Sequence, residues 1–244
     1  MRQLVERCLQ RFGFGVHRCR PDAFEVQKRL VTSPRPVIFD VGAHIGDAAA
    51  SYRLRFPSAA ISCFEPFPGA ASQLESRFAG DPGIEVHRLA LAASSGTSQM
   101  NVNSYVATNS LLPTDPGATR QWGLKHCETS STITVETTGI DQFCKGHSIP
   151  RIHILKLDVQ GGEYDVLKGA SEMLTRQAID LIYAEMIFAP TYQGQQPPGK
   201  YFQLMESFGY GLLDFYEPWR SGLRLMQADL LWLPLDTLNQ TSSL

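Results

Sequence analysis

Short apolar runs alternate with segments of helical spacing along most of the chain, and this alternation limits the fold more than any other feature. Runs that fit buried strands cover residues 37–41, 60–64, 152–157 and 179–187. Segments of about ten residues with helical spacing, such as 47–56 and 69–79, follow the strands. Such alternation is typical of βαβ units. The sequence therefore predicts an α/β fold with a mostly parallel sheet and helices on both faces.

The remaining elements are less regular. Residues 84–91 resemble another strand, and 97–102 is expected to turn back from it through Ser94-Ser95-Gly96. The last two strands, near 210–216 and 222–233, have no crossover helix between them, so we expect an antiparallel pair at one edge of the sheet.

A long polar stretch, residues 103–131, has no clear period. Connections of this length are often lids over a binding site. Tyr105, Asn109 and Trp122 could line an acceptor site there. The loop at 190–199 is expected at the same strand ends as a second acceptor contact.

The chain has 244 residues, which suits one large domain. We predict a domain over 36–244 and an N-terminal helical appendage over 1–35. Arginines alternate with apolar residues at helical spacing in the first twenty positions. This pattern favours an amphipathic helix packed on the body over a targeting or membrane segment.

Charge and cysteine content argue against several functions. The net charge is −2, so no nucleic-acid or anionic-membrane partner is expected. No apolar run is long enough to span a bilayer, at about 18 residues. Five widely spaced cysteines form no C-x-x-C pair, which fits reduced thiols in a cytoplasmic protein. Oligomeric state is left open, with a homodimer as one option.

The stretch VIFDVGAHIGD at 37–47 places two glycines at a strand-to-helix turn. Gly42 would let a ligand approach the backbone, and Gly46 would let the helix start close to the sheet. His44 occupies the slot where a dinucleotide site has its second glycine, which disfavours a pyrophosphate. Asp40 adds negative charge that would suit a cationic ligand.

Glu65 ends the second strand, nineteen residues after Gly46. An acid at this separation is suited to bind a ribose diol. Acids after two neighbouring strands, with a glycine turn between them, predict a site for S-adenosylmethionine, which carries an ammonium and a ribose but no phosphate.

A second constellation, HILKLDVQGGEYDVLKGA, spans residues 153–170. Lys156 and Asp158 are two apart in a strand and so face the same side of the sheet. Asp158, at the strand end, is the first candidate for a base. Glu163 is either a catalytic group or a charge partner of a helix dipole. Glu185 lies within an apolar strand, so it is expected either at the cleft end of that strand or paired with a base such as Lys156.

Several stretches together resemble the FkbM-type methyltransferases: DVGAHIGD, FEPFP, LALAASSGT, NSL at 109–111, LKLDVQGGEYDVLKGA and DLLWLP. The resemblance spans roughly residues 35–235. It implies a Rossmann-like class I methyltransferase fold with a seven-stranded sheet, S-adenosylmethionine as methyl donor, and O-methylation of a sugar, polyketide or other small molecule. Gln160, where the family commonly has Glu, and His44, where Asn is frequent, depart from the pattern.

We therefore predict two sets of site residues. The catalytic candidates are Asp158, Glu163, Glu185 and Lys156. The residues predicted to bind the cofactor are Asp40, Gly42, Ala43, His44, Gly46, Glu65, Pro66, Leu91, Asn109 and Asp158. No metal site is predicted, although a divalent cation at Asp158, Glu163 and Glu185 is kept as an alternative way to lower the pKa of an acceptor hydroxyl.

Two rival functions are weighed against an O-methyltransferase that acts on a small-molecule or glycan acceptor. A nicotinamide-dependent oxidoreductase would share the general fold, but His44 and Asp40 disfavour it. A non-catalytic binding protein that keeps the cofactor fold is the other rival. Substitution of Asp158, Glu163 and Glu185 would separate it from an enzyme.

Overall fold

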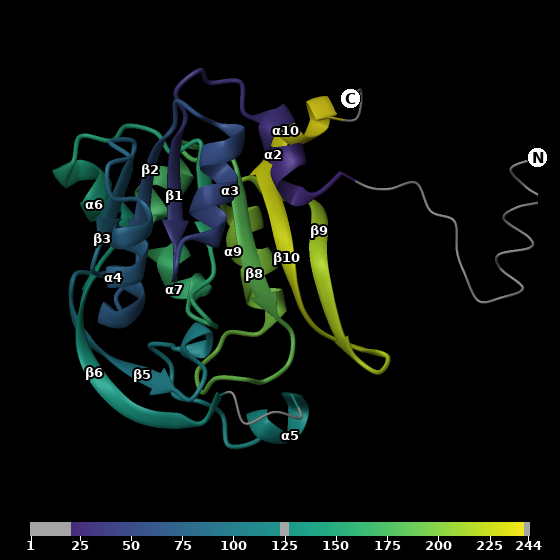
Figure 1. The fold of residues 1–244 in the computed structure, drawn as a ribbon. Helices are drawn as coiled ribbons and strands as arrows, with labels where there is room; N and C mark the ends of the chain where they lie inside the picture. Colours follow the sequence, from purple (N-terminus) through teal and green to yellow (C-terminus); the bar gives the residue numbers. More distant parts are fainter. Residues whose placement is uncertain (1–20, 123–126, 242–244) are drawn as a thin grey trace, which may run out of the picture.

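A seven-stranded sheet with helices on both faces forms the body of the protein (Figure 1). We analysed a computed structural model, which describes residues 21–122 and 127–241. The helix expected over the first twenty positions lies outside the described residues, and the proposed division at residue 35 stays a prediction. Within the described part, no helix has both the length and the hydropathy needed to span a bilayer.

The strand order is β3-β2-β1-β7-β8-β10-β9. Neighbours from β3 to β8 run parallel, whereas β10 is antiparallel to both β8 and β9. The predicted mostly parallel sheet with an antiparallel edge hairpin is therefore confirmed. The strands are β1 (Val37–Val41), β2 (Ala60–Phe64), β3 (Ile84–His87), β7 (Ile154–Leu157), β8 (Ile182–Ile187), β9 (Tyr210–Ser221) and β10 (Arg224–Pro234).

Alternation along β1 divides the core into two layers. Ile38 packs in the layer with α3 and α4, while Phe39 and Val41 pack in the opposite layer with α6 to α9. Successive side chains of a strand point to opposite faces, so an apolar central strand supplies both layers. The helices of the first layer are α2 (Ala23–Leu30), α3 (Asp47–Arg55), α4 (Pro68–Arg77) and α10 (Leu235–Thr241). Those of the second are α6 (Ile140–Gly146), α7 (Glu163–Lys168), α8 (Ser171–Thr175) and α9 (Pro198–Ser207).

A second sheet of three strands, in the order β4-β6-β5, lies beyond the carboxyl ends of β1 and β7 (Figure 1). Its strands are β4 (Ala90–Leu91), β5 (Gly96–Asn103) and β6 (Thr129–Thr138). The sequence did not predict it. The expected strand at 84–91 is split between the two sheets. The chain does turn back after β4, since β4 runs parallel to β6 and β5 runs antiparallel to it, but β6 lies between β4 and β5. The 103–131 stretch contains the 3-10 helix η1 (Val106–Thr108) and α5 (Ala118–Trp122).

The helical segment that follows β7 is divided into α7 and α8. Gly169 ends α7, and a Cβ there would collide with the carbonyl oxygen of Ala92. The close approach to the segment after β4 therefore requires glycine, and the helix is interrupted at that point. The two helices still bury apolar side chains in the same layer, since Val166 of α7 and Leu174 of α8 both belong to it.

Helix α2, from the N-terminal region, packs on α3. Asp22 caps α2 by accepting the backbone N–H of Glu25, and Arg55 of α3 pairs with Glu25 at 3.0 Å. Beneath them, the hydroxyl of Tyr52 donates to Gln27 at 3.0 Å, and both side chains are fully buried. These contacts place α2 far from the carboxyl ends of the strands, where the candidate site lies.

Candidate functional site

A cavity of about 460 Å³ lies at the carboxyl ends of β1, β2 and β7. The turn after β1 and the end of β2 form one side, and the second sheet with η1 forms the other. In open α/β sheets, ligands bind at this edge, where the strand order reverses on either side of the first strand. Its volume is in the range of small-molecule sites.

The turn after β1 has the backbone that the glycines were expected to provide. Gly42 has a φ of +73°, and a Cβ there would collide with the carbonyl oxygen of Asp158. The N–H groups of Gly42 and Ala43 donate to the carbonyl of Phe64, which joins the turn to β2. Gly46 has a φ of +89° and precedes α3. The turn is therefore fixed against both neighbouring strands.

Glu65 lines the cavity next to the turn and is 6% exposed. One carboxylate oxygen accepts the N–H of His44 at 2.9 Å, and the other accepts the N–H of Phe67 at 2.8 Å. Burial raises the pKa of Glu65, and the two backbone donors oppose that rise. Each oxygen keeps a free lone pair, so the carboxylate is held ready to accept two hydroxyl hydrogens.

Asp40 lies below this surface and does not reach the cavity. It is fully buried, and one of its oxygens lies 3.0 Å from the ammonium of Lys156 on the adjacent strand. Lys156 also donates to the carbonyl of Gly42 at 3.1 Å. Burial lowers the pKa of Lys156, but the carboxylates of Asp40 and Asp158 outweigh it, so the net pKa is raised. Any effect of Asp40 on a ligand therefore acts through Lys156 and the turn.

Asp158, at the end of β7, is the carboxylate that opens into the cavity beside Gly42, with 42% of its side chain exposed. One oxygen lies 3.6 Å from Lys156, and the other accepts the amide of Gln160 at 2.9 Å. Gln160 has a φ of +57° and also donates to Glu185 at 3.0 Å. The hydroxyl of Tyr192 lies 3.0 Å from the amide oxygen of Gln160. Gln160 thus connects Asp158 to β8 and to the loop that follows it.

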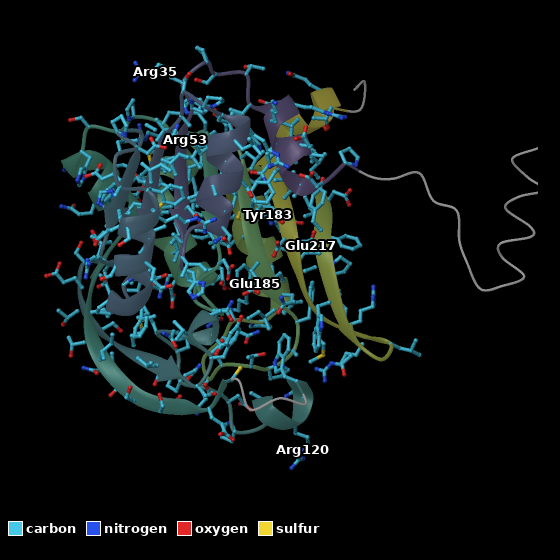
Figure 2. The ribbon with its side chains drawn as sticks, in the orientation of Figure 1. Arg35, Arg53, Arg120, Tyr183, Glu185 and Glu217 are labelled. Atoms are coloured by element: carbon cyan, nitrogen blue, oxygen red, sulfur yellow. The ribbon has the colours of Figure 1, made fainter. Side chains whose placement is uncertain are left out.

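Glu185 is buried inside the fold on β8, below Tyr183 in the view of Figure 2. Burial, and then the neighbouring carboxylates of Asp158 and Glu163, raise its pKa well above the usual value. Its side chain is absent from the cavity lining and contacts Gln160. The partner that the sequence required for Glu185 is therefore an amide and not a cation.

Glu163 turns back onto the backbone that precedes it. Its Oε1 accepts the N–H groups of Val159 and Gly161, at 2.8 and 3.3 Å, and its Oε2 accepts the hydroxyl of Tyr201 at 3.2 Å. Burial raises the pKa of Glu163 to about 7. These contacts hold the turn that carries Gln160, and the cavity lining does not include the Glu163 side chain.

The cavity brings together most of the predicted cofactor residues. Those that line it are Gly42, His44, Glu65, Pro66, Leu91, Asn109 and Asp158. Asp40, Ala43 and Gly46 do not: Asp40 lies beneath the turn, and Ala43 and Gly46 belong to the turn but are not among the lining residues. The sequence did not predict the side of the cavity that the second sheet forms, because the strands of that sheet pair residues that are far apart in the chain. This side includes Ala92, Ser94, Ser98, Met100 and Thr137.

The residues present fit S-adenosylmethionine better than a dinucleotide. Glu65 is oriented for a diol, and the side chains that line the described part of the cavity include carboxylates but no lysine or arginine. Such a surface favours a ligand with net positive charge and disfavours a pyrophosphate. No cluster of three or more His, Cys, Asp or Glu side chains suited to a metal ion occurs among residues 21–122 and 127–241.

The strand order and the cavity define a Rossmann-like class I methyltransferase that uses S-adenosylmethionine. The profile of the family described as "Methyltransferase FkbM domain" matches residues 40–212, and the chain belongs to this family. The resemblance drawn from the sequence motifs is confirmed. Of the two cofactors considered, S-adenosylmethionine is therefore the correct one, and the nicotinamide alternative is set aside.

Three known proteins show how far the similarity extends. The chain is 26% identical to 2-O-methyltransferase NoeI of Sinorhizobium fredii, with 84% of this chain and 86% of that one covered. It is 27% identical to hexuronic acid methyltransferase AglP of Haloferax volcanii, over 62% of this chain and 55% of that one. The structure of precorrin-6y C5,15-methyltransferase from Geobacter metallireducens aligns with a TM-score of 0.46 and 9% identity, with 86% of each chain covered.

Proposed function

We propose that this methyltransferase methylates a hydroxyl oxygen of a small-molecule or glycan acceptor. The observation that carries the proposal is the carboxylate of Asp158, which opens into the cavity beside the Gly42 turn. A neutral hydroxyl is a poor nucleophile, so an O-methyltransferase needs a group that takes its proton. The relative described as a 2-O-methyltransferase, which matches most of this chain, supports the same chemistry.

Residues of the turn and of β2 would hold the cofactor. Glu65 would accept the two ribose hydroxyls, while Gly42 would leave room for the ligand next to the backbone. When bound, S-adenosylmethionine supplies a methyl group that its sulfonium makes electrophilic. Alignment of an acceptor oxygen with such a group is the main task left to the protein.

Asp158 is the general base in this proposal. It would accept the proton of the acceptor hydroxyl as that oxygen becomes methylated. Lys156, at 3.6 Å, and Gln160, at 2.9 Å, position the carboxylate from two sides. Because Gln160 also contacts Glu185, we assign Lys156, Gln160 and Glu185 to positioning, and Glu163 to holding the turn beneath them.

Acceptor contacts would come from the segment around η1 and from the loop after β8. Val106, Ala107 and Leu112 line the same cavity as Asp158. The loop after β8 is tied to that segment, since the hydroxyl of Tyr192 lies 3.0 Å from the carbonyl of Thr108. The acceptor would thus enter between two loops. The lengths and side chains of these loops would determine which acceptor molecules fit.

The test uses S-adenosylmethionine with an isotope-labelled methyl group, incubated with the protein and a metabolite extract. Mass spectrometry locates labelled products, and the carbon-13 shift of the transferred methyl separates O-methyl from N-methyl. Asp158→Asn should reduce turnover by about 10²- to 10⁴-fold, the usual contribution of a general base. Asp165→Asn is the matched control, because Asp165 also lines the cavity but neither takes the proton nor positions Asp158 in the proposal.

The outcome separates the enzyme from a binding module. An O-methylated product that disappears in Asp158→Asn and persists in Asp165→Asn supports the proposal. If S-adenosylhomocysteine binds but no labelled product forms, the protein is a non-catalytic module. If Asp158→Asn turns over as fast as wild type, the base is assigned to the wrong residue.

A further inference from the structure

Asn109 carries a buried donor that no described residue satisfies. Its side-chain oxygen accepts the N–H of Asn103 at 2.8 Å. Since a backbone N–H can only donate, this contact fixes which end of the amide is oxygen and which is nitrogen. Asn109 is 7% exposed and lines the cavity, and its Nδ2 has no hydrogen-bond partner among the described residues.

An unpartnered buried donor is unfavourable, so its presence in a binding cavity indicates an acceptor atom on the ligand. The residues on either side of Asn109 are both joined to the Asp158 end of the cavity. Ser110 donates its hydroxyl to the carbonyl of Gln160 at 2.8 Å, and the carbonyl of Thr108 contacts Tyr192, which also contacts Gln160. Asn109 therefore belongs to the end of the cavity where the proposed base lies.

The charges around this end of the cavity restrict which molecules can be the methyl acceptor. The ionisable side chains that line the cavity include the carboxylates of Glu65, Asp158 and Asp165, with no lysine or arginine within the described lining. Lys156 lies beneath the cavity and is engaged by Asp40 and by the carbonyl of Gly42. Arg120, on α5, points away from the body (Figure 2).

Resting on the proposed function, we infer that the acceptor is a neutral polyhydroxylated molecule, such as an uncharged glycoside, with one oxygen bound to Nδ2 of Asn109. A carboxylate or phosphate on the acceptor would meet like charges, with no lysine or arginine in the described lining to pair with. The bound cofactor adds one net positive charge, which a single carboxylate balances. Hydroxyl groups suit this surface, since they donate to Asp158 and accept from Asn109.

The first arm of the test compares matched acceptors. p-Nitrophenyl glucoside, galactoside and fucoside are each assayed for methyl transfer beside p-nitrophenyl glucuronide and galacturonide. We expect kcat/KM for the neutral glycosides to exceed that for the uronides by at least tenfold. Equal or faster transfer to the uronides overturns the inference, as does transfer to neither set.

Calorimetry with S-adenosylhomocysteine separates failure of this inference from failure of the proposed function. If the cofactor product binds and only uronides are methylated, the O-methyltransferase stands and the neutral acceptor is wrong. If O-methylation of any acceptor is absent while binding is intact, both fail.

The second arm uses Asn109→Asp, which keeps an oxygen for the N–H of Asn103 but removes the free donor. We expect the KM for the best neutral glycoside to rise about tenfold, with the Kd for S-adenosylhomocysteine within twofold of wild type. Asn101→Asp is the matched control, since the amide of Asn101, on β5, already donates to the carbonyl of Ser110 at 3.2 Å and Asn101 does not line the cavity. This control should lower thermal stability and leave KM within twofold. A rise in the cofactor Kd of Asn109→Asp without a rise in KM would make Asn109 a cofactor contact and overturn the inference.

Discussion

Lys156 and Asp40 form an ion pair at 3.0 Å inside the central sheet, directly beneath the turn that borders the cavity. Their strands, β1 and β7, place the two residues opposite each other in register. Neither oxygen of Asp40 has a well-aligned hydrogen bond from a described residue, so the contact is mainly electrostatic. The pair links the stability of the sheet to the position of Asp158.

Removal of one partner of this pair should be costly. Lys156→Met leaves Asp40 buried without a cation, and we expect a loss of about 3–5 kcal/mol in the free energy of unfolding. Urea denaturation at neutral pH measures it. The double variant Asp40→Asn/Lys156→Met should recover a large part of that loss, because no charge remains buried. A single variant within about 1 kcal/mol of wild type would contradict the assigned role.

Glu163 should make stability depend on pH. Burial raises its pKa from 4.5 to about 7, so the folded state holds a proton that the unfolded state releases. The stability that protonated Glu163 contributes is fully present below pH 4.5 and is lost as pH rises through about 7. Glu163→Gln keeps an oxygen for the N–H groups of Val159 and Gly161 but does not titrate, so its stability should not fall in this way.

The comparison is made by urea denaturation from pH 4.5 to pH 7.5. Relative to wild type, Glu163→Gln should gain up to about 2–3 kcal/mol over this interval. Since Asp158 is the proposed base, Glu163→Gln should retain turnover. A stability difference that does not change with pH would show that Glu163 has an ordinary pKa.

Position 42 should require glycine for two reasons: a larger residue would collide with its surroundings, and its backbone would be strained. Gly42→Ala would drive a Cβ into the carbonyl of Asp158 at a φ of +73°. We expect a loss of more than about 2 kcal/mol, since the left-handed conformation alone costs about 1–2 kcal/mol, together with weaker cofactor binding. Gly80→Ala is the control: its φ is +93°, but nothing lies within 4 Å of the added Cβ. Equal losses in the two variants would rule out the collision.

A stacked pair of tryptophans joins α5 to the β9–β10 hairpin. The rings of Trp122 and Trp219 are 4.7 Å apart at 15°, and Trp122 also donates to the hydroxyl of Thr191 at 2.7 Å. Stacked indoles should give a coupled circular-dichroism signal in the wild type, which Trp219→Phe weakens and Trp219→Leu abolishes. Trp219→Leu should cost about 0.5–1.5 kcal/mol. A spectrum unchanged by Trp219→Leu would contradict the stack.

The sequence predicted the central sheet well because local pattern determines its strands. The apolar runs at 37–41 and 60–64 coincide with β1 and β2. It did not predict the second sheet, whose strands β4 and β6 pair across more than forty residues. The short helix α6, of seven residues, also gives too little periodicity to be recognised.

The same contrast holds for the site residues: those determined by local sequence were predicted, and those that depend on tertiary contacts were not. Gly42 and Glu65 were identifiable because a turn and a strand end restrict which residues can serve there. Asp40 was expected at the ligand, but the alternation of β1 directs its side chain into the layer beneath α3 and beside Lys156. The contacts of Gln160 with Asp158 and Glu185 depend on its left-handed backbone and on the pairing of β7 with β8, neither of which the sequence shows.

Calorimetric titration of S-adenosylhomocysteine into wild type and Glu65→Gln tests the central claim most directly. Gln keeps an oxygen for one of the two backbone donors but loses the carboxylate that would accept both ribose hydroxyls. We predict saturable binding to the wild type and a Kd raised at least tenfold in Glu65→Gln, with both proteins folded by circular dichroism. Equal affinity in the two proteins, or no binding to the wild type, would contradict a cofactor site at this edge of the sheet.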